Sequence, residues 1–395
     1  MNNITNKPVV YRQKKYSLTN RQENPSKKEI SFKGGLKVLG KDCFEIAGSQ
    51  TKAKIFAKEI SDEAVSEIEE LCSYPIFYNA PIRIMPDVSA CRKCVVGFTA
   101  KIDPEKVNEL SPDIIGTDIG CGVLLVKTDT KAGDVDLENL DRFIKTELFT
   151  NKKLRPEIPA NLKQDIKESC QQYKRDDEIV FDQMGTLGNG NHFIELDKDA
   201  DDNIYLAIHT GSRQYGDFVK SYYLANRQPQ NELFYSDSVK IAQNYAAYNR
   251  MSIADMIVDR FKMKSSTDFD CQHNYISNEG VVHKGSIDAS EGTPVLIPLN
   301  MRDGIILGKG KGNKDWNCSA PHGAGRKLSR NDARTHIDLK DYQETMSGIY
   351  SSVIGKKTLD EAPQAYKDSE DTLDLIKNTV DVEEIIHPYY NYKKR

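Results

Sequence analysis

"GVLLVKT", at residues 122–128, is a short apolar run, rich in β-branched residues, that is bounded by glycine and polar residues. Three other segments share this character: "CVVGF" at 94–98, "IYLAIHT" at 204–210 and "TPVLIPL" at 293–299. Apolar runs of about 4–8 residues that end in Gly, Pro or polar residues are typical of strands. The sequence therefore predicts a β-strand in each of the four segments.

Two segments instead show helical periodicity. Residues 61–72, "SDEAVSEIEELC", have Ser61 as a candidate N-cap, and their expected buried face consists of Ala64, Val65, Ile68, Leu71 and Cys72. Residues 236–262 predict a longer helix, with expected buried positions Val239, Ala242, Tyr245, Ala246, Ile253, Met256, Ile257 and Phe261. Because strands and helices mix without strict βαβ alternation, the pattern favours an α+β fold over a doubly wound sheet.

The composition is that of a globular protein. The chain has 395 residues, of which 38% are hydrophobic and 29% are charged. No apolar run approaches the roughly 18 residues of a membrane helix, and the first residues lack a hydrophobic signal region. We therefore expect a cytoplasmic protein without membrane association. The net charge of −4 neither indicates nor excludes nucleic-acid binding, because a local basic groove is sufficient.

Residues 1–35 differ from the rest of the chain. They carry eight Lys and Arg residues against two Glu residues, and they lack apolar periodicity. This composition favours a disordered basic tail over a transit peptide or an RNA-attracting arm. Residues 36–395 show no internal repeat and no linker, so they are predicted to form a single domain.

The eight cysteines are scattered along a long chain without an export signal, so we expect reduced thiols. Cys91 and Cys94 have C-x-x-C spacing, but no second pair follows at the distance of a zinc ribbon. The sequence thus disfavours a structural zinc site.

Five polar loops carry potential metal ligands or nucleophiles. Four contain a histidine: His192 in "GTLGNGNHFIEL" (185–196), His209 in "AIHTGSRQYG" (207–216), His273 in "CQHNY" (271–275) and His322 in "NCSAPHGAGRKLSR" (317–330). The fifth, "IGTDIGCGVLL" (115–125), contains Asp118 and Cys121. Thiolate, carboxylate and imidazole groups suit a borderline transition metal, and a thiolate has enough lone pairs to bridge two ions.

Any one of these residues alone is more often a core or turn residue than a ligand. Their joint occurrence in Gly-rich loops, where the backbone allows close approach of a ligand, favours a functional site. At this point His322 is open to three interpretations: core residue, metal ligand or nucleophile.

Neither of the standard nucleotide-binding motifs, GxxxxGK[ST] and GxGxxG, is present. "GKGKGNKD" (308–315) is a basic Gly-rich loop that could hold phosphates through backbone N–H groups and through Lys309 or Lys311. A plain solvated hairpin turn explains it equally well.

Taken in order, "DIGCG", "GTLGNGNHFIE", "HTGSRQYG", "HNY" and "SAPHGAGRKLSR" resemble the RtcB family of RNA ligases. The resemblance runs from about residue 80 to the C-terminus, in a shorter variant of the family, and includes "LDEAPQAYK" and "IHPYYNYKK". It implies one catalytic domain with mixed and antiparallel sheets around a dinuclear metal site. The implied cofactors are GTP and two Mn²⁺ ions.

The implied reaction joins an RNA 3′-phosphate, or a 2′,3′-cyclic phosphate after opening, to a 5′-hydroxyl through a covalent histidine–GMP. It would serve RNA repair or tRNA splicing, with RNA as partner and, in some family members, an archease-type activator. Two alternatives remain: a relative that guanylylates ends without sealing them, and a metal-bound RNA-binding protein without turnover.

The resemblance also implies a role for individual residues. His322 corresponds to the guanylylated nucleophile, and Asp87 to a catalytic residue in the N-terminal loop of the family. The metal ligands correspond to Asp118, Cys121, His192, His209 and His273, with Cys121 as the bridge. The nucleotide site corresponds to Asn191, Glu195, Asn274, Asn300, Gly323, Ala324, Gly325, Tyr366 and Lys393. Arg326 and Arg330 correspond to arginines that hold RNA phosphates.

Two loops depart from the family pattern. In "DVSACRKC" (87–94), Asp87 is kept, but Ser89, Cys91 and Lys93 replace a histidine and glycines. In "IPLNMRDGII" (297–306), Asn300 and Ile305 replace two serines near the nucleotide. The altered loop at 87–94 is the reason to consider end-guanylylation without sealing, whereas the changes at residues 300 and 305 predict altered contacts with the guanine or the phosphates.

Overall fold

The computed structural model describes residues 15–17, 35–226 and 234–394. The predicted basic tail, residues 1–35, lies outside the described residues apart from Lys15–Ser17 and Gly35. No helix within these ranges is both long and apolar enough to cross a membrane.

Two seven-stranded sheets form the body of the protein. The first, here called the β8 sheet, is antiparallel throughout, in the order β11 (Ser265–Gln272), β8 (Gly122–Lys131), β10 (Asn203–Thr210), β9 (Phe193–Lys198), β18 (Val380–Tyr392), β16 (Gly304–Gly310) and β15 (Pro294–Asn300). The second, the β6 sheet, has the order β12 (Asn274–Ile276), β13 (Val281–Lys284), β7 (Val96–Lys101), β6 (Ile82–Ser89), β4 (Lys52–Phe56), β3 (Cys43–Ala47) and β2 (Lys37–Gly40). It is mixed, because β4 and β6 pair in parallel.

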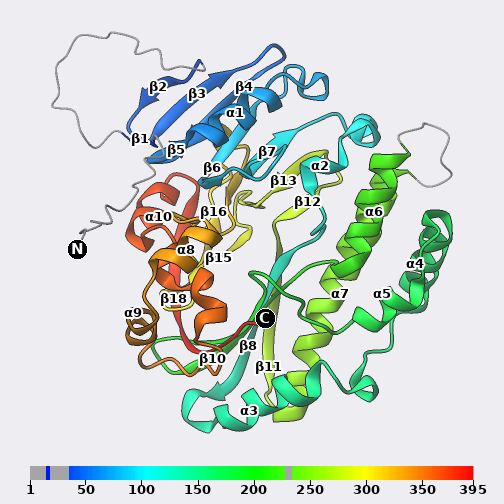
Figure 1. Cartoon of the computed structure of the whole chain (residues 1–395), viewed down its shortest axis with the longest axis vertical. Coiled ribbons are helices and arrows are strands. Elements are labelled where there is room, and N and C mark those ends of the chain that lie inside the picture. The colour runs from blue at the N-terminus through cyan, green and yellow to red at the C-terminus, as the bar shows by residue number, and fades with distance from the viewer. Residues whose placement is uncertain (1–14, 18–34, 227–233, 395) are drawn as a thin grey trace, which may run out of the picture.

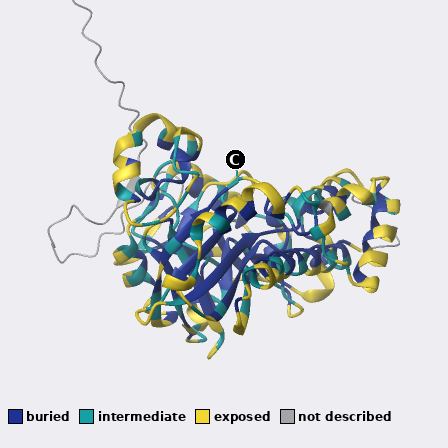
Figure 2. Ribbon diagram, turned by 90° about the horizontal axis from the view of Figure 1, so that it is seen from below, coloured by how far each residue is buried: buried dark blue, intermediate teal, exposed yellow. Residues whose placement is uncertain are grey.

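Two smaller antiparallel pairs complete the strands: β1 (Lys15–Ser17) with β5 (Glu59–Ser61), and β14 (Ser286–Asp288) with β17 (Ser319–Pro321). The α-helices lie around the sheets: α1 (Asp62–Leu71), α2 (Pro112–Ile115), α3 (Leu137–Phe143), α4 (Ala160–Tyr173), α5 (Asp177–Gln183), α6 (Arg213–Ala225), α7 (Tyr235–Phe261), α8 (Arg330–His336), α9 (Leu339–Thr345) and α10 (Ser369–Ile376). Helices α4–α7 form one flank and α8–α10 the opposite one (Figure 1). Figure 2 shows the buried strands in the interior and the exposed residues mainly on the surrounding helices and loops.

The predicted α+β class is confirmed, with mixed and antiparallel sheets. The four predicted strands correspond to β7, β8, β10 and β15, although β7 begins at Val96 rather than Cys94. Helix α1 is capped as expected, because the Ser61 hydroxyl accepts a hydrogen bond of 3.3 Å from the amide of Ala64. Its predicted apolar face is buried.

Helix α7 matches the second predicted helix, with its apolar face packed against β8 and β10. Met256 and Phe261, which were expected to be buried, are half-buried. The unexpected feature is a polar pair in the middle of the helix, Asn249 and Arg250, in which both side chains are fully buried.

Candidate active site

Strand register explains how distant loops meet. Gly122, the first residue of β8, pairs with Thr210 at the end of β10 and with Gln272 at the end of β11. Cys121, Thr210 and His273 are therefore neighbours at one edge of the β8 sheet, the edge at which β8 begins and β10 and β11 end. His209, one residue before Thr210, pairs with Phe193 of β9, which brings the preceding histidine, residue 192, to the same edge.

The five predicted metal ligands lie together at this edge. Asp118, Cys121 and His192 form one group of three, and Cys121, His209 and His273 form another, with the donor atoms of each group within 4.8 Å of one another. The Cys121 sulfur lies 3.2 Å from His209 Nε2 and 3.6 Å from His192 Nε2. Cys121 belongs to both groups, so its sulfur is a potential ligand in each.

Backbone carbonyls orient two of the imidazoles. His192 Nδ1 lies 2.9 Å from the Leu187 carbonyl, and His209 Nδ1 lies 3.2 Å from the Asn191 carbonyl. A carbonyl can only accept, so the Nδ1 of His209 carries the proton and its Nε2 presents a lone pair. His192 Nε2 lies 3.0 Å from Asp118 Oδ2, so this ring has an acceptor beside each of its nitrogens. Burial lowers the pKa of His209 well below its usual value, and it does the same for His273. These two rings are therefore neutral near pH 7, as metal ligation requires.

The cysteine adds a second indication of a cation. Burial and the adjacent Asp118 carboxylate raise the pKa of the Cys121 thiol well above its usual value. A coordinated metal ion offsets such a penalty and deprotonates the thiol. The Asp118 carboxylate also packs closely against Gly211, where the Cβ of any other residue would lie only 2.0 Å from Asp118 Oδ1. The donor set and its packing fit a divalent transition metal.

Arg250 of α7 fixes three of these loops at once. Its guanidinium donates from Nε and Nη2 to the two carboxylate oxygens of Asp270, at 2.5 and 2.7 Å. Its Nη1 donates to the carbonyls of Gly120, at 2.8 Å, and Thr210, at 2.6 Å. These three partners lie within three residues of Cys121, His209 and His273. Arg250 thus ties the ligand-bearing loops to the helix behind them.

We expect Arg250→Met to destabilise the fold by about 3–5 kcal/mol, as is typical when one partner of a buried ion pair is removed. Metal affinity should fall as well, since the loops lose their common anchor. Urea unfolding and calorimetric metal titration measure the two effects. Arg260→Met, on the exposed side of the same helix, is the matched control, and it should change stability by no more than about 1 kcal/mol. Equal effects of the two substitutions would contradict the anchoring role.

His322 lies outside both ligand groups and is paired with a carboxylate. It follows β17, and its Nδ1 lies 2.5 Å from Asp87 Oδ2. The same carboxylate oxygen accepts from the His322 backbone amide at 3.1 Å. A proton held on Nδ1 by Asp87 leaves the lone pair on Nε2, the arrangement of an activated nucleophile. The ring centroid of His273 is 4.6 Å from that of His322, so the pair adjoins the metal-ligand groups.

The turn after His322 needs glycine for close packing. Gly325 has a φ of +76°, and a Cβ there would lie 2.7 Å from the Asp87 Cα. Ala324 is buried, and its amide donates to the Pro298 carbonyl at 3.3 Å. The turn therefore packs directly against Asp87, which keeps His322 within hydrogen-bonding distance of the Asp87 carboxylate.

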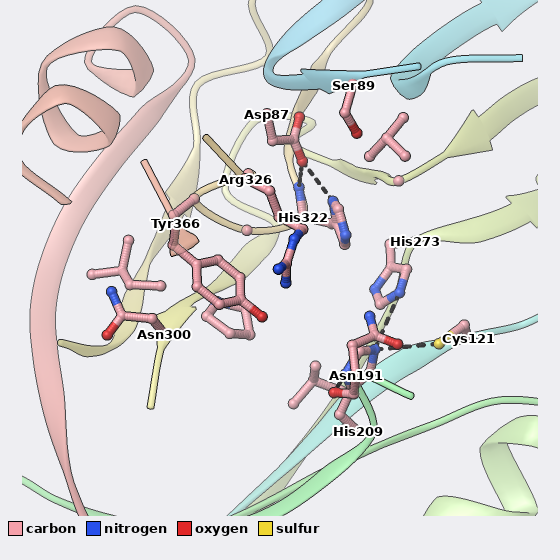
Figure 3. A pocket seen from close by; sticks show the side chains of 18 of the residues that line it. Asp87, Ser89, Cys121, Asn191, His209, His273, Asn300, His322, Arg326 and Tyr366 are labelled. Atoms are coloured by element: carbon pink, nitrogen blue, oxygen red, sulfur yellow. Dashed lines mark hydrogen bonds and ion pairs between the residues drawn. The ribbon is translucent and has the colours of Figure 1, made fainter. Parts of the chain in front are cut away.

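One cavity of about 420 Å³ connects these features. Figure 3 shows Asp87 and His322 at its centre, the Cys121, His209 and His273 group on one side, and Tyr366 and Asn300 on the other. The predicted nucleotide and RNA residues that line the cavity are Asn191, Glu195, Asn274, Asn300, Gly323, Ala324, Gly325, Arg326, Arg330, Tyr366 and Lys393. The cavity thus brings together the residues that the family resemblance singles out, except His192, which lines a neighbouring cavity.

Several of these side chains are already engaged. Asn274 donates to the Asp118 carbonyl at 3.2 Å and accepts from the Gly285 amide at 2.9 Å. Asn300 is bonded to Asp303, to whose carboxylate its amide donates at 2.7 Å. These contacts shape the walls of the cavity.

The two departures from the family pattern fall in different environments. Ser89 and Cys91 line the cavity, where the loop is held by Glu67 of α1, whose carboxylate accepts from the amides of Cys91 and Arg92 at 2.9 Å each. Ile305 instead lies in β16, fully buried in the core. The loop at 87–94 therefore remains part of the candidate site, whereas Ile305 does not contribute to it.

The basic loop at 308–315 does not lie on this cavity. Lys309 pairs with Glu383 at 2.8 Å, and Lys311 pairs with Asp381 at 3.0 Å. Its lysines are thus partly neutralised on the surface of β16 and β18, which favours the plain-turn interpretation over a phosphate loop.

Glu195 belongs to a buried carboxyl pair on β9. Burial raises its pKa to about 7, although Asn391 and Lys393 favour the ionised form. Asp197, two residues along the same strand, has a pKa raised well above its usual value by burial and by Glu195. The pair therefore shares a proton near neutral pH.

Three residues of this region were not singled out from the sequence, although Phe193 and Glu361 lie within the motifs "GTLGNGNHFIE" and "LDEAPQAYK" that carry the family resemblance. Phe193 lines the cavity. Glu361 contacts four other residues that line the cavity: Arg326, Arg330, Tyr366 and Lys393. Arg250 anchors the ligand loops from a helix in which only apolar positions were expected to be buried. Contacts between residues so distant in the chain leave no local pattern that could have revealed them.

Comparison with known proteins agrees with this geometry. A family model described as "tRNA-splicing ligase RtcB" matches residues 67–180 and 159–394. The RNA-splicing ligase RtcB of Escherichia coli K12 is 27% identical over 359 residues, which cover 76% of this chain and 87% of that protein. The tRNA-splicing ligase RtcB of Methanococcus maripaludis is 27% identical over 447 residues, covering 86% of this chain and 93% of that protein.

Proposed function

The chain belongs to the RtcB family of tRNA-splicing ligases, and from this membership we propose that it joins RNA ends with GTP and two Mn²⁺ ions. The substrates are an RNA 3′-phosphate, or a 2′,3′-cyclic phosphate after opening, and a 5′-hydroxyl. The observation that carries the proposal is the Asp87–His322 pair beside two ligand groups that share Cys121, all on one cavity.

In the first proposed step, His322 Nε2 attacks the α-phosphorus of GTP. An N–P bond forms, the bond to the pyrophosphate oxygen breaks, and pyrophosphate leaves. Asp87 holds the Nδ1 proton throughout and stabilises the positive charge that develops on the ring. The product is a histidine–GMP phosphoramidate, an activated link.

In the second step, an oxygen of the RNA 3′-phosphate attacks this phosphorus, and His322 leaves as neutral imidazole. In the third, the 5′-hydroxyl oxygen attacks the activated 3′-phosphate, a new P–O bond forms the phosphodiester, the bond to GMP breaks, and the hydroxyl proton passes to the leaving GMP or to solvent. Arg326 and Arg330, which line the same cavity, would hold RNA phosphates.

Asp118, Cys121, His192, His209 and His273 would hold the two ions. When bound, manganese would neutralise phosphate charge and align the reacting groups for in-line displacement. Glu195, Tyr366 and Lys393 would hold the guanine, with the Glu195 carboxylate accepting from its N–H groups.

A ligation assay tests the proposal. RNA with 3′-phosphate and 5′-hydroxyl ends, incubated with the protein, GTP and Mn²⁺, should yield joined product, and His322→Ala should yield none. Guanylylated but unjoined RNA would instead show an end-guanylylating enzyme in which the altered 87–94 loop prevents sealing. Binding of RNA and metal with neither product would contradict catalysis altogether.

The Glu195 pKa predicts how GTP binding depends on pH. Below about pH 7 the carboxyl is protonated and is a poor acceptor for the guanine N–H groups, whereas above it the carboxylate accepts fully. GTP affinity should therefore rise between about pH 6 and pH 8, around this pKa. Calorimetric titration of His322→Ala with GTP measures binding without chemistry, and Glu195→Gln in that background should flatten the profile. A flat profile with Glu195 present would contradict the assignment.

A further inference from the structure

Four cavity-lining residues converge on a single carboxylate, that of Glu361. Its Oε2 accepts from Lys393 Nζ at 2.7 Å and from the Tyr366 hydroxyl at 2.8 Å. Its Oε1 accepts from Arg330 Nη1 and lies 3.6 Å from Arg326 Nη1. Tyr366 and Lys393 belong to the proposed guanine site, whereas Arg326 and Arg330 belong to the proposed RNA phosphate site. One side chain thus contacts both.

The carboxylate is buried and charged. Glu361 has no exposed surface. Although burial opposes ionisation, Lys393 and Arg330 hold its pKa well below the usual value. Burial and Glu361 raise the pKa of Tyr366, so the phenol keeps its proton and remains a donor. All four contacts therefore persist at neutral pH.

The surrounding charges leave an excess for a phosphate ligand. The neighbouring Asp360 accepts from Arg330 at 2.9 Å and from Arg334 at 3.1 Å. Four cations, those of Arg326, Arg330, Arg334 and Lys393, thus face the two carboxylates of Asp360 and Glu361. These six side chains carry two positive charges beyond neutrality, and the Glu195 carboxyl, which also interacts with Lys393, reduces this excess when it is ionised. The remaining positive charge suits the binding of anionic RNA.

The backbone and ring contacts reinforce the same link. Arg326 and Tyr366 form an isolated antiparallel bridge, and the Arg326 guanidinium stacks 5.0 Å from the Tyr366 ring centroid. Lys367 donates its amide to the Gly325 carbonyl at 3.0 Å. Figure 3 shows Arg326 and Tyr366 side by side on the cavity wall next to His322. Tyr366 of the proposed guanine site and its neighbour Lys367 therefore contact the turn that follows His322.

We propose that Glu361 is a positioning residue that couples guanine binding to RNA phosphate binding, because it holds Lys393 and Tyr366 with one oxygen and Arg330 and Arg326 with the other. This inference rests on the proposed function. When a ligand displaces or strengthens one of these contacts, the contacts on the other oxygen adjust, so occupancy of one site alters the affinity of the other.

The proposal is tested by the effect that a substitution in one site has on the KM of the ligand of the other site, here called a cross-effect. Arg330→Met should raise the KM for GTP, and Lys393→Met should raise the KM for RNA, each by about three- to thirtyfold, which lies within the coupling range for residues of one network. In the Glu361→Gln background both cross-effects should disappear, while the direct effect of each substitution on its own ligand remains. A residue that only supports the fold would lower kcat or stability without abolishing the cross-effects.

Arg334→Met is the matched control, because the Arg334 hydrogen bond goes to Asp360. Because Arg334 contributes to the positive charge of the network, its replacement should affect RNA affinity directly, but it should leave both cross-effects as they are in the wild type. If Glu361→Gln does not fold, Glu361→Asp keeps the charge but shortens the reach, and its cross-effects should be intermediate. Cross-effects that are absent in the wild-type background, or unchanged without Glu361, would overturn the inference. Loss of ligation in the wild-type protein would instead refute the proposed function itself.

Discussion

Cys121→Ala is expected to abolish binding of the two proposed metal ions and to slow ligation more than about a hundredfold. Cys121 is the one donor common to the two groups of potential ligands, so its removal leaves two donors in each. Even residues that merely orient metal ligands cost about 10–100-fold when replaced, so loss of a shared ligand should cost more. Metal content by mass spectrometry and the rate of RNA joining measure the two effects.

Cys271→Ala provides the matched control for this change. Cys271 is also a buried thiol, on β11, but it lies outside both groups of potential ligands. Its replacement should lower stability slightly and leave metal content and ligation near those of the wild type. A Cys121→Ala protein that binds two ions and ligates at the wild-type rate would contradict the bridging role.

Asp87→Asn is expected to slow guanylylation of His322 by about a thousandfold or more, by analogy with the same change in a Ser-His-Asp triad. The Asp87 carboxylate can only accept, so it fixes the proton on His322 Nδ1 and the lone pair on Nε2. An asparagine amide can donate to Nδ1, which favours the tautomer with its proton on Nε2. That nitrogen then lacks the lone pair it needs to attack.

The rate of label transfer from α-labelled GTP to the protein in a single turnover measures this effect. Asp141→Asn is a suitable control, because Asp141 is also buried and hydrogen-bonded, to Ser352 at 2.6 Å and Tyr390 at 3.1 Å, but does not line the cavity. It should affect stability more than labelling. Equal labelling rates in Asp87→Asn and the wild type would show that the carboxylate does not set the tautomer.

Much of the fold followed from local patterns. The apolar run at 122–128 is the strand β8 at the heart of the larger sheet, and Ser61 caps α1 because its hydroxyl precedes an amphipathic stretch. Such features depend on neighbours in the chain, which the sequence displays directly. The order of strands depends instead on contacts between distant segments, such as β18 between β9 and β16, and no local pattern specifies them.

The same division holds for the candidate site. The ligand-bearing loops are conspicuous because glycine, histidine and cysteine seldom cluster in this way, and strand register then brings Cys121 beside His209 and His273. The residues that hold the site together were not foreseen. Arg250 lies in a helix whose polar positions are ordinarily solvated. Glu361 lies in the family motif "LDEAPQAYK", but nothing in that stretch indicates which of its residues is buried. Each is stabilised in the interior by partners that are distant in sequence: Arg250 by the Asp270 carboxylate and two backbone carbonyls, and Glu361 by the side chains of Arg330 and Lys393.

Covalent labelling of the protein by GTP tests the central claim most directly. Wild-type protein incubated with α-labelled GTP and Mn²⁺ should retain label that is stable to alkali and lost in acid, as expected of a phosphoramidate, and His322→Ala should retain none. Absence of labelled protein, or undiminished labelling of His322→Ala, would contradict the assignment of His322 as the nucleophile.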